Sequence, residues 1–385
     1  MNKFGGLEVE KAKLGTAWLT VVMMFVGLAA TEVSAVYVVE EIVNSTGIGI
    51  DIRGLGVNDA GIVTGWQLNG TYRRAYAYES RGTKTVTELP LYSGGLKSEA
   101  YGINNVAQPQ VVGYVPTSGG INNWHKTRWE YEPILEQWVV TDLGTLPGDN
   151  WSVGRAINDL GQIAGGHDSL HASLYLPTAA YGLSAGMNDL GTLGGTTSIG
   201  QGINEYGEVV GYAQDGSGLN CAFLWLPTAR NGKLAGMNNL QYGGTQSYAS
   251  GINDSGQIAV YRLYGGVWQS FVENANGSNT QIIKPGGAYG IIATAINNSG
   301  VVVGSYDNSS GRFGFVWDSV NGTQTLAEMA GWTNYEFNGI SDTGYIVGQG
   351  INPSGQLAAF VIVPEPATIG LLCLGGLALI RRKRQ

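Results

Sequence analysis

Two histidines four residues apart are the first residues whose spacing suggests chemistry. On a helix, His167 and His171 would share one face, where such pairs bind metal ions. They fall between Gly165-Gly166 and an aromatic segment that begins at Ala172, which favours a hairpin turn and the strand after it. We therefore predict no metal site and no cofactor.

A second group of chemically interesting residues lies around His125. The stretch from Thr117 to Tyr131 is the least repetitive part of the chain, and we interpret it as an insertion. Function tends to reside on loops that protrude from a rigid scaffold. Aromatic faces with Asn and Gln around them suit sugar rings, so Trp124 and Trp129 are the candidate ligand-contact aromatics. The alternative is a decorative insertion whose tryptophans pack between strands.

No catalytic arrangement is evident. A glycosidase needs two carboxylates across a cleft, and the acids here are spread over many turns. The chain has no Gly-x-Ser-x-Gly nucleophile motif and no phosphate-binding loop. Cys221 begins an apolar strand, where a small packed side chain is expected. We predict no catalytic residues and a protein that is not an enzyme.

Composition restricts the fold. Gly accounts for 61 of 385 residues, hydrophobic residues for 43% and charged residues for only 13%. This balance excludes a charge-rich disordered chain and a long-helix protein, because helices disfavour glycine. Residues 36–363 carry 14 basic and 25 acidic side chains, a net charge of −11. Such an acidic segment argues against nucleic acid as a partner.

The N-terminal 35 residues are typical of a secretory signal. Lys11 and Lys13 precede an apolar run, and Val33-Ser34-Ala35 places small residues where signal peptidase reads them. We expect a signal peptide over residues 1–35, helical in its apolar run, with cleavage after Ala35. The alternative is an uncleaved N-terminal anchor.

The C-terminal 22 residues contain three parts in order. Pro364-Glu365-Pro366 is followed by an apolar run over residues 367–380 and by Arg381-Arg382-Lys383-Arg384. As a helix, the 14 apolar residues span about 21 Å, less than the roughly 30 Å of a hydrocarbon core. The basic cluster would hold this end on the cytoplasmic side. The alternative to a sorting signal is a plain C-terminal anchor.

This tail resembles the PEP-CTERM sorting signal. The resemblance implies recognition of Pro364, Glu365 and Pro366 by exosortase, a membrane cysteine peptidase, in bacteria that make exopolysaccharide. It also implies an exported protein at the cell envelope or outside the cell. Its tail would contact the inner membrane transiently or permanently.

A short phrase recurs seven times between the two ends. It begins as Gly56-Val57-Asn58-Asp59-Ala60-Gly61, and copies follow at intervals of 46, 54, 46, 49, 44 and 44 residues. The marker residues of the copies are Asn58, Asn104, Asn158, Asn204, Asn253, Asn297 and Ser341. Six copies have glycine three residues later: Gly61, Gly161, Gly207, Gly256, Gly300 and Gly344. Such a glycine supplies the positive φ of a hairpin turn, so these residues are interpreted as structural.

Each repeat contains four short apolar segments in about 45 to 50 residues, the pattern of a β-propeller blade. The sequence therefore predicts an all-β, seven-bladed propeller over residues 36–363. The last unit lacks a fourth strand, which residues 36–42 can supply and so close the ring. The rival is an open solenoid. Irregular hairpins are expected in the second unit, at Val106-Ala107-Gln108-Pro109, and in the fifth, at Ala259-Val260-Tyr261.

The repeats resemble the HAF family of bacterial extracellular repeats, named for a His-Ala-Phe strand. Here the triplet is Cys221-Ala222-Phe223, and His171-Ala172 is a partial copy. The resemblance implies an extracellular location more than an activity.

Two hypotheses follow. The first is a non-enzymatic, surface-sorted structural or binding module, with surface polysaccharide as a candidate partner. The second is a carbohydrate-active enzyme that works at the axial mouth of the propeller. Convergence of Asp and Glu at that mouth would favour the second.

Overall fold

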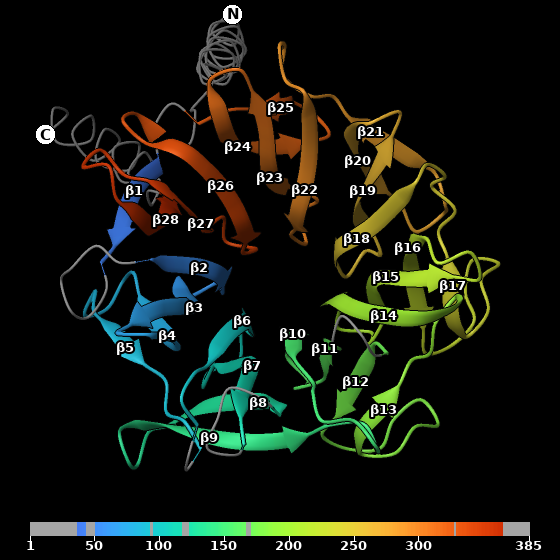
Figure 1. Ribbon diagram of the computed structural model, residues 1–385, viewed down its shortest axis with the longest axis horizontal. Coiled ribbons are helices and arrows are strands. Elements are labelled where there is room, and N and C mark those ends of the chain that lie inside the picture. Colours follow the sequence, from blue (N-terminus) through green and yellow to red (C-terminus); the bar gives the residue numbers. More distant parts are fainter. Residues whose placement is uncertain are drawn as a thin grey trace, which may run out of the picture. The chain divides into compact units, whose positions relative to one another are not determined.

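The computed structural model describes residues 37–43, 51–92, 95–117, 123–166, 171–326 and 329–364. Residues 38–364 form one compact unit. Its regular elements are strands, arranged as seven four-stranded antiparallel sheets around a central axis (Figure 1). The predicted seven-bladed β-propeller is therefore confirmed. The segments expected to be helical, in the signal peptide and the sorting tail, lie outside the described residues.

Each sheet forms one blade, and its four strands follow the chain from the axis outward. The first three blades contain β2 (Ile52–Val57), β3 (Ile62–Asn69), β4 (Tyr72–Glu79) and β5 (Val86–Glu88); β6 (Glu99–Ile103), β7 (Gln110–Pro116), β8 (Trp124–Glu132) and β9 (Gln137–Gly144); and β10 (Gly154–Ile157), β11 (Ile163–Gly165), β12 (Ser173–Leu176) and β13 (Gly186–Asp189).

The next three blades have the same order. They contain β14 (Gly194–Ile203), β15 (Val209–Asp215), β16 (Asn220–Leu226) and β17 (Gly236–Asn239); β18 (Gln246–Ile252), β19 (Ile258–Tyr264), β20 (Val267–Glu273) and β21 (Asn279–Ile282); and β22 (Gly290–Ile296), β23 (Val302–Asn308), β24 (Gly311–Asp318) and β25 (Gly322–Gln324).

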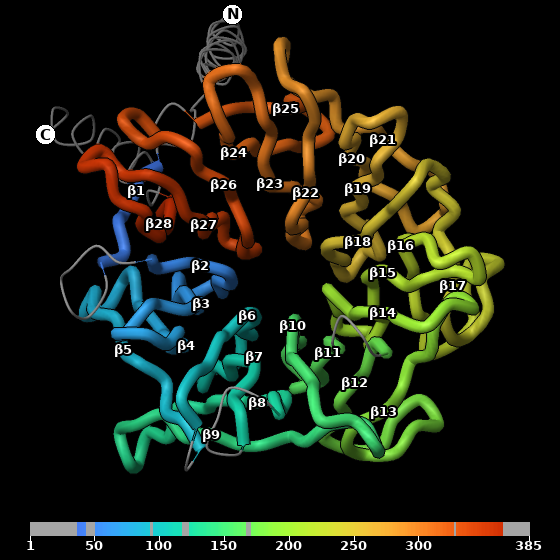
Figure 2. The backbone as a smooth tube through the Cα atoms, in the orientation of Figure 1, coloured from blue at the N-terminus to red at the C-terminus, as the bar shows by residue number. Residues whose placement is uncertain are grey.

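The seventh blade joins the two ends of the propeller. β26 (Thr333–Ile340), β27 (Ile346–Ile351) and β28 (Leu357–Pro364) form its first three strands, and β1 (Tyr37–Ile42) is hydrogen-bonded beside β28. Figure 2 shows β1, in blue, next to the red end of the described chain. The N-terminal strand thus supplies the missing fourth, outermost strand of the seventh blade, as the spacing predicted, and this pairing closes the ring.

The hydrophobic core lies between adjacent blades. Val210, Leu224 and Leu226 of the fourth blade pack with Ile258 and Phe271 of the fifth, and similar clusters join other neighbouring blades. Strands with both faces covered read as apolar runs, which accounts for the short Val-Val-Gly and Phe-Leu-Trp segments.

A close approach of two strands explains the second glycine that six of the seven blades have in this hairpin. The first strand has a bulge in all seven blades, for example between Gly200 and Gly202. A Cβ at Gly211 would lie 1.9 Å from the carbonyl oxygen of Ile199, and the equivalent glycines are as crowded. Glycine is favoured where another backbone comes so near, and the fifth blade, with Val260 at this position, is the exception.

Two expectations about irregular units have different outcomes. The second hairpin is irregular as predicted, because the N–H of Asn104 donates to Gln110 rather than to a residue four positions later. The fifth hairpin is regular, with Asn253 bonded to Gln257, so that prediction was wrong. Its turn residues are intact, and only the close-approach glycine is replaced, by the buried Val260.

The interpretation of residues 117–131 as an insertion is also corrected. Most of this stretch is β8, the third strand of the second blade. Its position in the blade is that of the other third strands, but its residue types differ: it has His125-Lys126-Thr127 where other blades have Ala-Phe-type triplets. Lys126 and Ala172 occupy equivalent positions, because the N–H of Lys126 donates to Ser152 Oγ and the N–H of Ala172 donates to Ser198 Oγ, each serine preceding the next blade or lying in it.

Candidate functional site

The marker asparagine of each phrase closes its own turn. In the third blade, Asn158 Oδ1 accepts the N–H of Gln162 at 2.9 Å, and its carbonyl accepts the N–H of Gly161 at 3.0 Å. Gly161 has φ +73°, in the left-handed region that favours glycine. The same bonds recur in the other blades except the second, where Asn104 Oδ1 accepts the N–H of Gln110, and in the seventh Ser341 Oγ accepts the N–H of Tyr345.

The same asparagines also join neighbouring blades. Each Nδ2 donates to the carbonyl of the next marker residue, over 3.0 to 3.2 Å, and the chain of bonds runs from Asn58 through Asn104, Asn158, Asn204, Asn253 and Asn297 to Ser341. These side chains are buried around the axis. The last junction differs, because Thr343 Oγ1 donates to the carbonyl of Asp59 at 2.9 Å.

A second ring of bonds involves the residue after each marker. The backbone N–H of Asp159 donates to Glu205 Oε1 at 2.8 Å, and that of Glu205 donates to Asp254 Oδ1 at 2.9 Å. Six such bonds, and one from Thr343 N–H to Asp59, pass around the axis. The axial ring comprises Asp59, Asn105, Asp159, Glu205, Asp254, Asn298 and Asp342.

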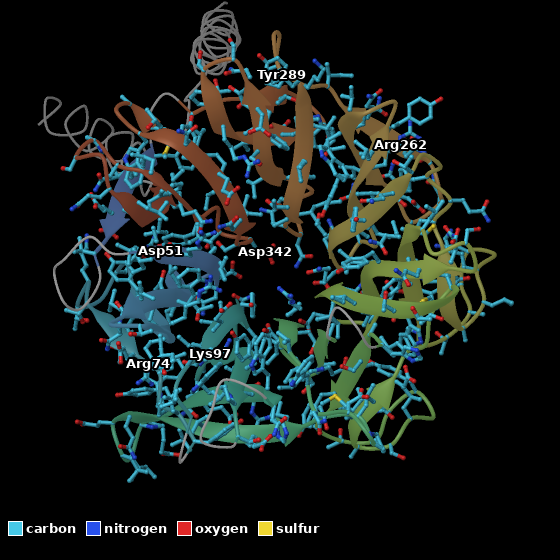
Figure 3. The ribbon with its side chains drawn as sticks, in the orientation of Figure 1. Asp51, Arg74, Lys97, Arg262, Tyr289 and Asp342 are labelled. Atoms are coloured by element: carbon cyan, nitrogen blue, oxygen red, sulfur yellow. The ribbon has the colours of Figure 1, made fainter. Side chains whose placement is uncertain are left out.

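The axial ring surrounds a cavity of about 170 Å³, near which Asp342 is labelled in Figure 3. Burial raises the pKa of Glu205, and the charges of Asp159 and Asp254 raise it further, against the N–H bond that lowers it. Asn298 Nδ2 donates to Oδ2 of both Asp254 and Asp342, at 2.9 and 2.8 Å. The mouth is thus acidic, and its carboxylates accept bonds from the blades themselves.

The two described histidines make equivalent hydrogen bonds to aspartates. His125 Nδ1 lies 2.9 Å from Asp142, and His171 Nδ1 lies 2.8 Å from Asp189. Each aspartate also accepts the N–H of a glycine two residues later. These pairs link the third and fourth strands of their blades, and His167 lies outside the described residues. In the described part of the chain, no three His, Cys, Asp or Glu side chains are grouped to hold a metal ion.

The two candidate aromatics lie in different surroundings. Trp129 is fully buried, and its indole N–H donates to the carbonyl of Pro90 at 2.8 Å. Trp124 is half-buried and lines a separate cavity with Lys97 and Arg155. Cys221 is half-buried, and burial beside Asp215 raises the pKa of its thiol, the reverse of an activated nucleophile.

The axial ring was missed by reasoning from sequence alone. An acid or amide follows the marker residue in all seven copies, and this constant position was the available signal. It was interpreted as turn chemistry because spacing along the chain does not reveal contacts with the next repeat. Of the sorting residues, only Pro364 is described, at the end of β28. Ala35, Glu365, Pro366 and the basic cluster Arg381, Arg382, Lys383 and Arg384 lie outside the described residues.

Comparison with known proteins identifies the C-terminal signal. The family described as "PEP-CTERM protein-sorting motif" matches residues 363–385. The chain therefore carries a signal for exosortase processing, and it is an exported protein sorted to the cell envelope or the extracellular space. No helix in the described ranges is long and apolar enough to cross a membrane. No curated protein matches the chain significantly.

Solved structures agree with the fold. YCF48 from Cyanidioschyzon merolae aligns with a TM-score of 0.52 at 10% identity, over 86% of this chain and all of that one. A streptogramin B lyase structure aligns with a TM-score of 0.51 at 11% identity, over 85% and 98%. TolB from Acinetobacter baumannii aligns at 0.43 and 10% identity, over 77% and 78%. At these identities the first two support the propeller fold alone.

Proposed function

We propose that this protein is a non-enzymatic propeller displayed at the cell surface, a structural or binding module of the envelope and its polysaccharide matrix. One observation carries the proposal: the acids that converge at the axial mouth are used to hold the blades together. A catalytic carboxyl must be able to exchange its proton with substrate. Carboxylates that each accept a backbone N–H from the neighbouring blade are instead part of the scaffold.

The extracellular repeat resemblance fits this role. His125 and His171 occupy the same place at the start of the third strand, each paired with an aspartate. We propose that the repeats are of the HAF type, with a histidine retained in two blades and Cys221 in its place in a third. Export would pass through signal peptidase cleavage after Ala35 and exosortase recognition of the tail.

Retention by the host matrix tests the binding role. The full-length protein, purified in a detergent without sugar groups, is mixed with extracellular polysaccharide from its host and sedimented. Retention that a neutral polysaccharide such as dextran does not reproduce supports the proposal. Failure to associate with either the host polysaccharide or host envelopes would remove the binding role.

A second candidate function is hydrolysis of polysaccharide at the axial mouth. The observation that favours it is the raised pKa of Glu205, since a carboxyl kept protonated can act as a general acid. Prolonged incubation with host polysaccharide, followed by assay of new reducing ends, tests this function. Release that Glu205→Gln abolishes would overturn the non-enzymatic proposal, whereas no release over a broad glycan panel supports it.

A further inference from the structure

The cavity beside Trp124 lies on the face of the propeller opposite the axial ring. β6 begins at Glu99 next to this cavity and ends at Ile103, where the asparagine turn follows. Three blades contribute to its wall: the first through Arg73, the second through Lys97 and Trp124, and the third through Arg155. Figure 3 labels Lys97 in this region. The cavity is therefore distinct from the axial mouth.

The charge of this cavity is opposite to that of the rest of the propeller. Three cations and one carboxylate, Glu99, are found in the described lining. Glu99 is 5% exposed, and its oxygens accept Arg73 Nη1 at 2.7 Å, Tyr114 Oη at 2.9 Å and Tyr101 Oη at 2.7 Å. Glu99 thus fixes the positions of the Arg73 guanidinium and of the Tyr101 and Tyr114 hydroxyl groups. The cavity keeps a positive charge within a segment whose net charge is −11.

Two of the cations are held against aromatic rings. Lys97 Nζ lies 4.0 Å from the ring centroid of Trp124, and Arg155 Cζ lies 4.5 Å from that of Tyr101. Neither forms an ion pair with an acid of the described chain. Arg155 Nε is buried and makes no hydrogen bond there. Burial lowers the pKa of Lys97, Glu99 raises it and Arg73 lowers it, so a bound anion would favour the charged form of this amine.

Aromatic side chains that pack against one another form one wall of the cavity, against which a small ligand ring could lie. Tyr114 stacks on Trp124 with centroids 4.6 Å apart and planes 15° apart, and Trp151 lies 6.2 Å from Trp124. Tyr114 is held by Glu99 and is almost fully buried. The cavity volume is about 230 Å³, roughly eight times the share of one water molecule in the liquid. This volume suits a single sugar ring with its substituents.

We propose that this cavity binds a carboxylate-bearing sugar residue of an acidic polysaccharide. The carboxylate lies between Lys97 and Arg155, because a guanidinium presents paired donors that match a carboxylate. The sugar ring lies against the aromatic wall that includes Trp124. This inference rests on the proposed matrix-binding function and assigns a site and a ligand class to it.

Calorimetric titration tests the site with the full-length protein in a detergent without sugar groups. The ligands are a hexuronic acid trimer, a neutral hexose trimer and a sulfated hexose trimer, each at low and high salt. We expect binding of the hexuronate, no binding of the neutral trimer and weaker binding at high salt. Lys97→Gln and Arg155→Gln should each weaken binding about tenfold or more.

Two further variants separate charge, geometry and folding. Arg155→Lys keeps the charge but loses the paired donors, so it should also weaken hexuronate binding. Arg81→Gln is the matched control, because Arg81 lies 5.1 Å over the Tyr345 ring on an exposed turn outside the cavity. It should bind as wild type does. Thermal melting of each variant shows that the fold is retained.

Several results would overturn the inference. Equal binding of neutral and acidic trimers would refute charge recognition, and preference for the sulfated trimer would refute the carboxylate. Wild-type affinity in Lys97→Gln and Arg155→Gln would refute the location. If these variants still sediment with host polysaccharide as wild type does, the site is wrong and the proposed function stands. If wild type binds hexuronate but not host polysaccharide, the cavity is supported and the matrix role falls.

Discussion

Lys126 is a buried amine between the second and third blades, and replacing it with methionine should change how stability depends on pH. Its side chain is fully buried, and Nζ donates to Ser173 Oγ at 3.0 Å and to the Ile163 carbonyl at 3.4 Å. Burial lowers its pKa to about 7. No acid of the described residues pairs with it, so the folded protein favours the neutral amine.

The direction and size of the effect follow from proton linkage. Between pH 7.5 and 9.5, lysine in the unfolded chain is protonated, with a pKa near 10.4, whereas Lys126 in the folded protein is neutral. The unfolded state binds more protons, so the free energy of unfolding increases with pH. One proton is worth about 1.4 kcal/mol per pH unit. Allowing for partial titration at both limits, wild type should gain about 2.5 kcal/mol across this interval.

Lys126→Met removes the titrating group and keeps a similar length of apolar chain. Urea denaturation of both proteins, followed by tryptophan fluorescence at half-unit pH steps, gives the difference in unfolding free energy. That difference should shift by about 2.5 kcal/mol from pH 7.5 to 9.5. Burial raises the pKa of the Cys221 thiol, but any contribution of this group is common to both proteins and cancels.

Lys84→Met provides the control, because the Lys84 side chain is 58% exposed. It should leave the pH dependence of wild type unchanged. Parallel curves for wild type and Lys126→Met would refute the reasoning, since they would mean that Lys126 stays charged in the folded protein.

Three further predictions concern the scaffold and the tail. Gly211→Ala should lower the free energy of unfolding, measured by urea denaturation, by about 2 to 3 kcal/mol, because the new Cβ would lie 1.9 Å from a carbonyl oxygen. Gly216→Ala is the control: open space surrounds Gly216, so the free energy of unfolding should change by less than about 0.5 kcal/mol. Asn158→Ala should lower the free energy of unfolding by about 2 to 3 kcal/mol, because it leaves buried hydrogen-bonding groups unpaired. Asn276→Ala, in an exposed turn, is the control and should lower it by less than about 1 kcal/mol. Glu365→Ala should leave the tail attached, so mass spectrometry of envelope protein should detect peptides beyond residue 366 only in the variant; their presence in wild type would contradict exosortase cleavage.

The repeat made the fold predictable. Seven copies at nearly constant spacing specify seven blades, and the missing last strand specifies closure by the N-terminal strand. The turn asparagines were identifiable because their hydrogen bonds lie within one hairpin. Their second role, the bond from each Nδ2 to the next blade, was hidden because nothing in a linear spacing tells which copies touch.

Sequence reasoning had less success where residues replaced the repeat pattern. The second blade carries His125-Lys126-Thr127 in its third strand, and polar residues in a normally apolar strand made it look like a loop. Lys97 and Arg155 meet in the cavity, although they occupy different positions in different repeats. Contacts between blades bring these two residues together, so no sequence motif predicts the site that they form.

A repeat protein offers a physical criterion for separating scaffold from function. A feature present in every copy is expected to have a role that every blade shares. The axial acids have such a role, because they join each blade to the next. A feature found in a single copy is not required by the ring. In the described chain, the combination of Lys97, Arg155 and Trp124 around a cavity belongs to one place, on a surface opposite the axial ring, and it puts cations into an otherwise acidic protein. Because closing the ring does not explain those cations, a ligand is the better explanation, and the acidic mouth is the weaker candidate for activity despite its position on the axis.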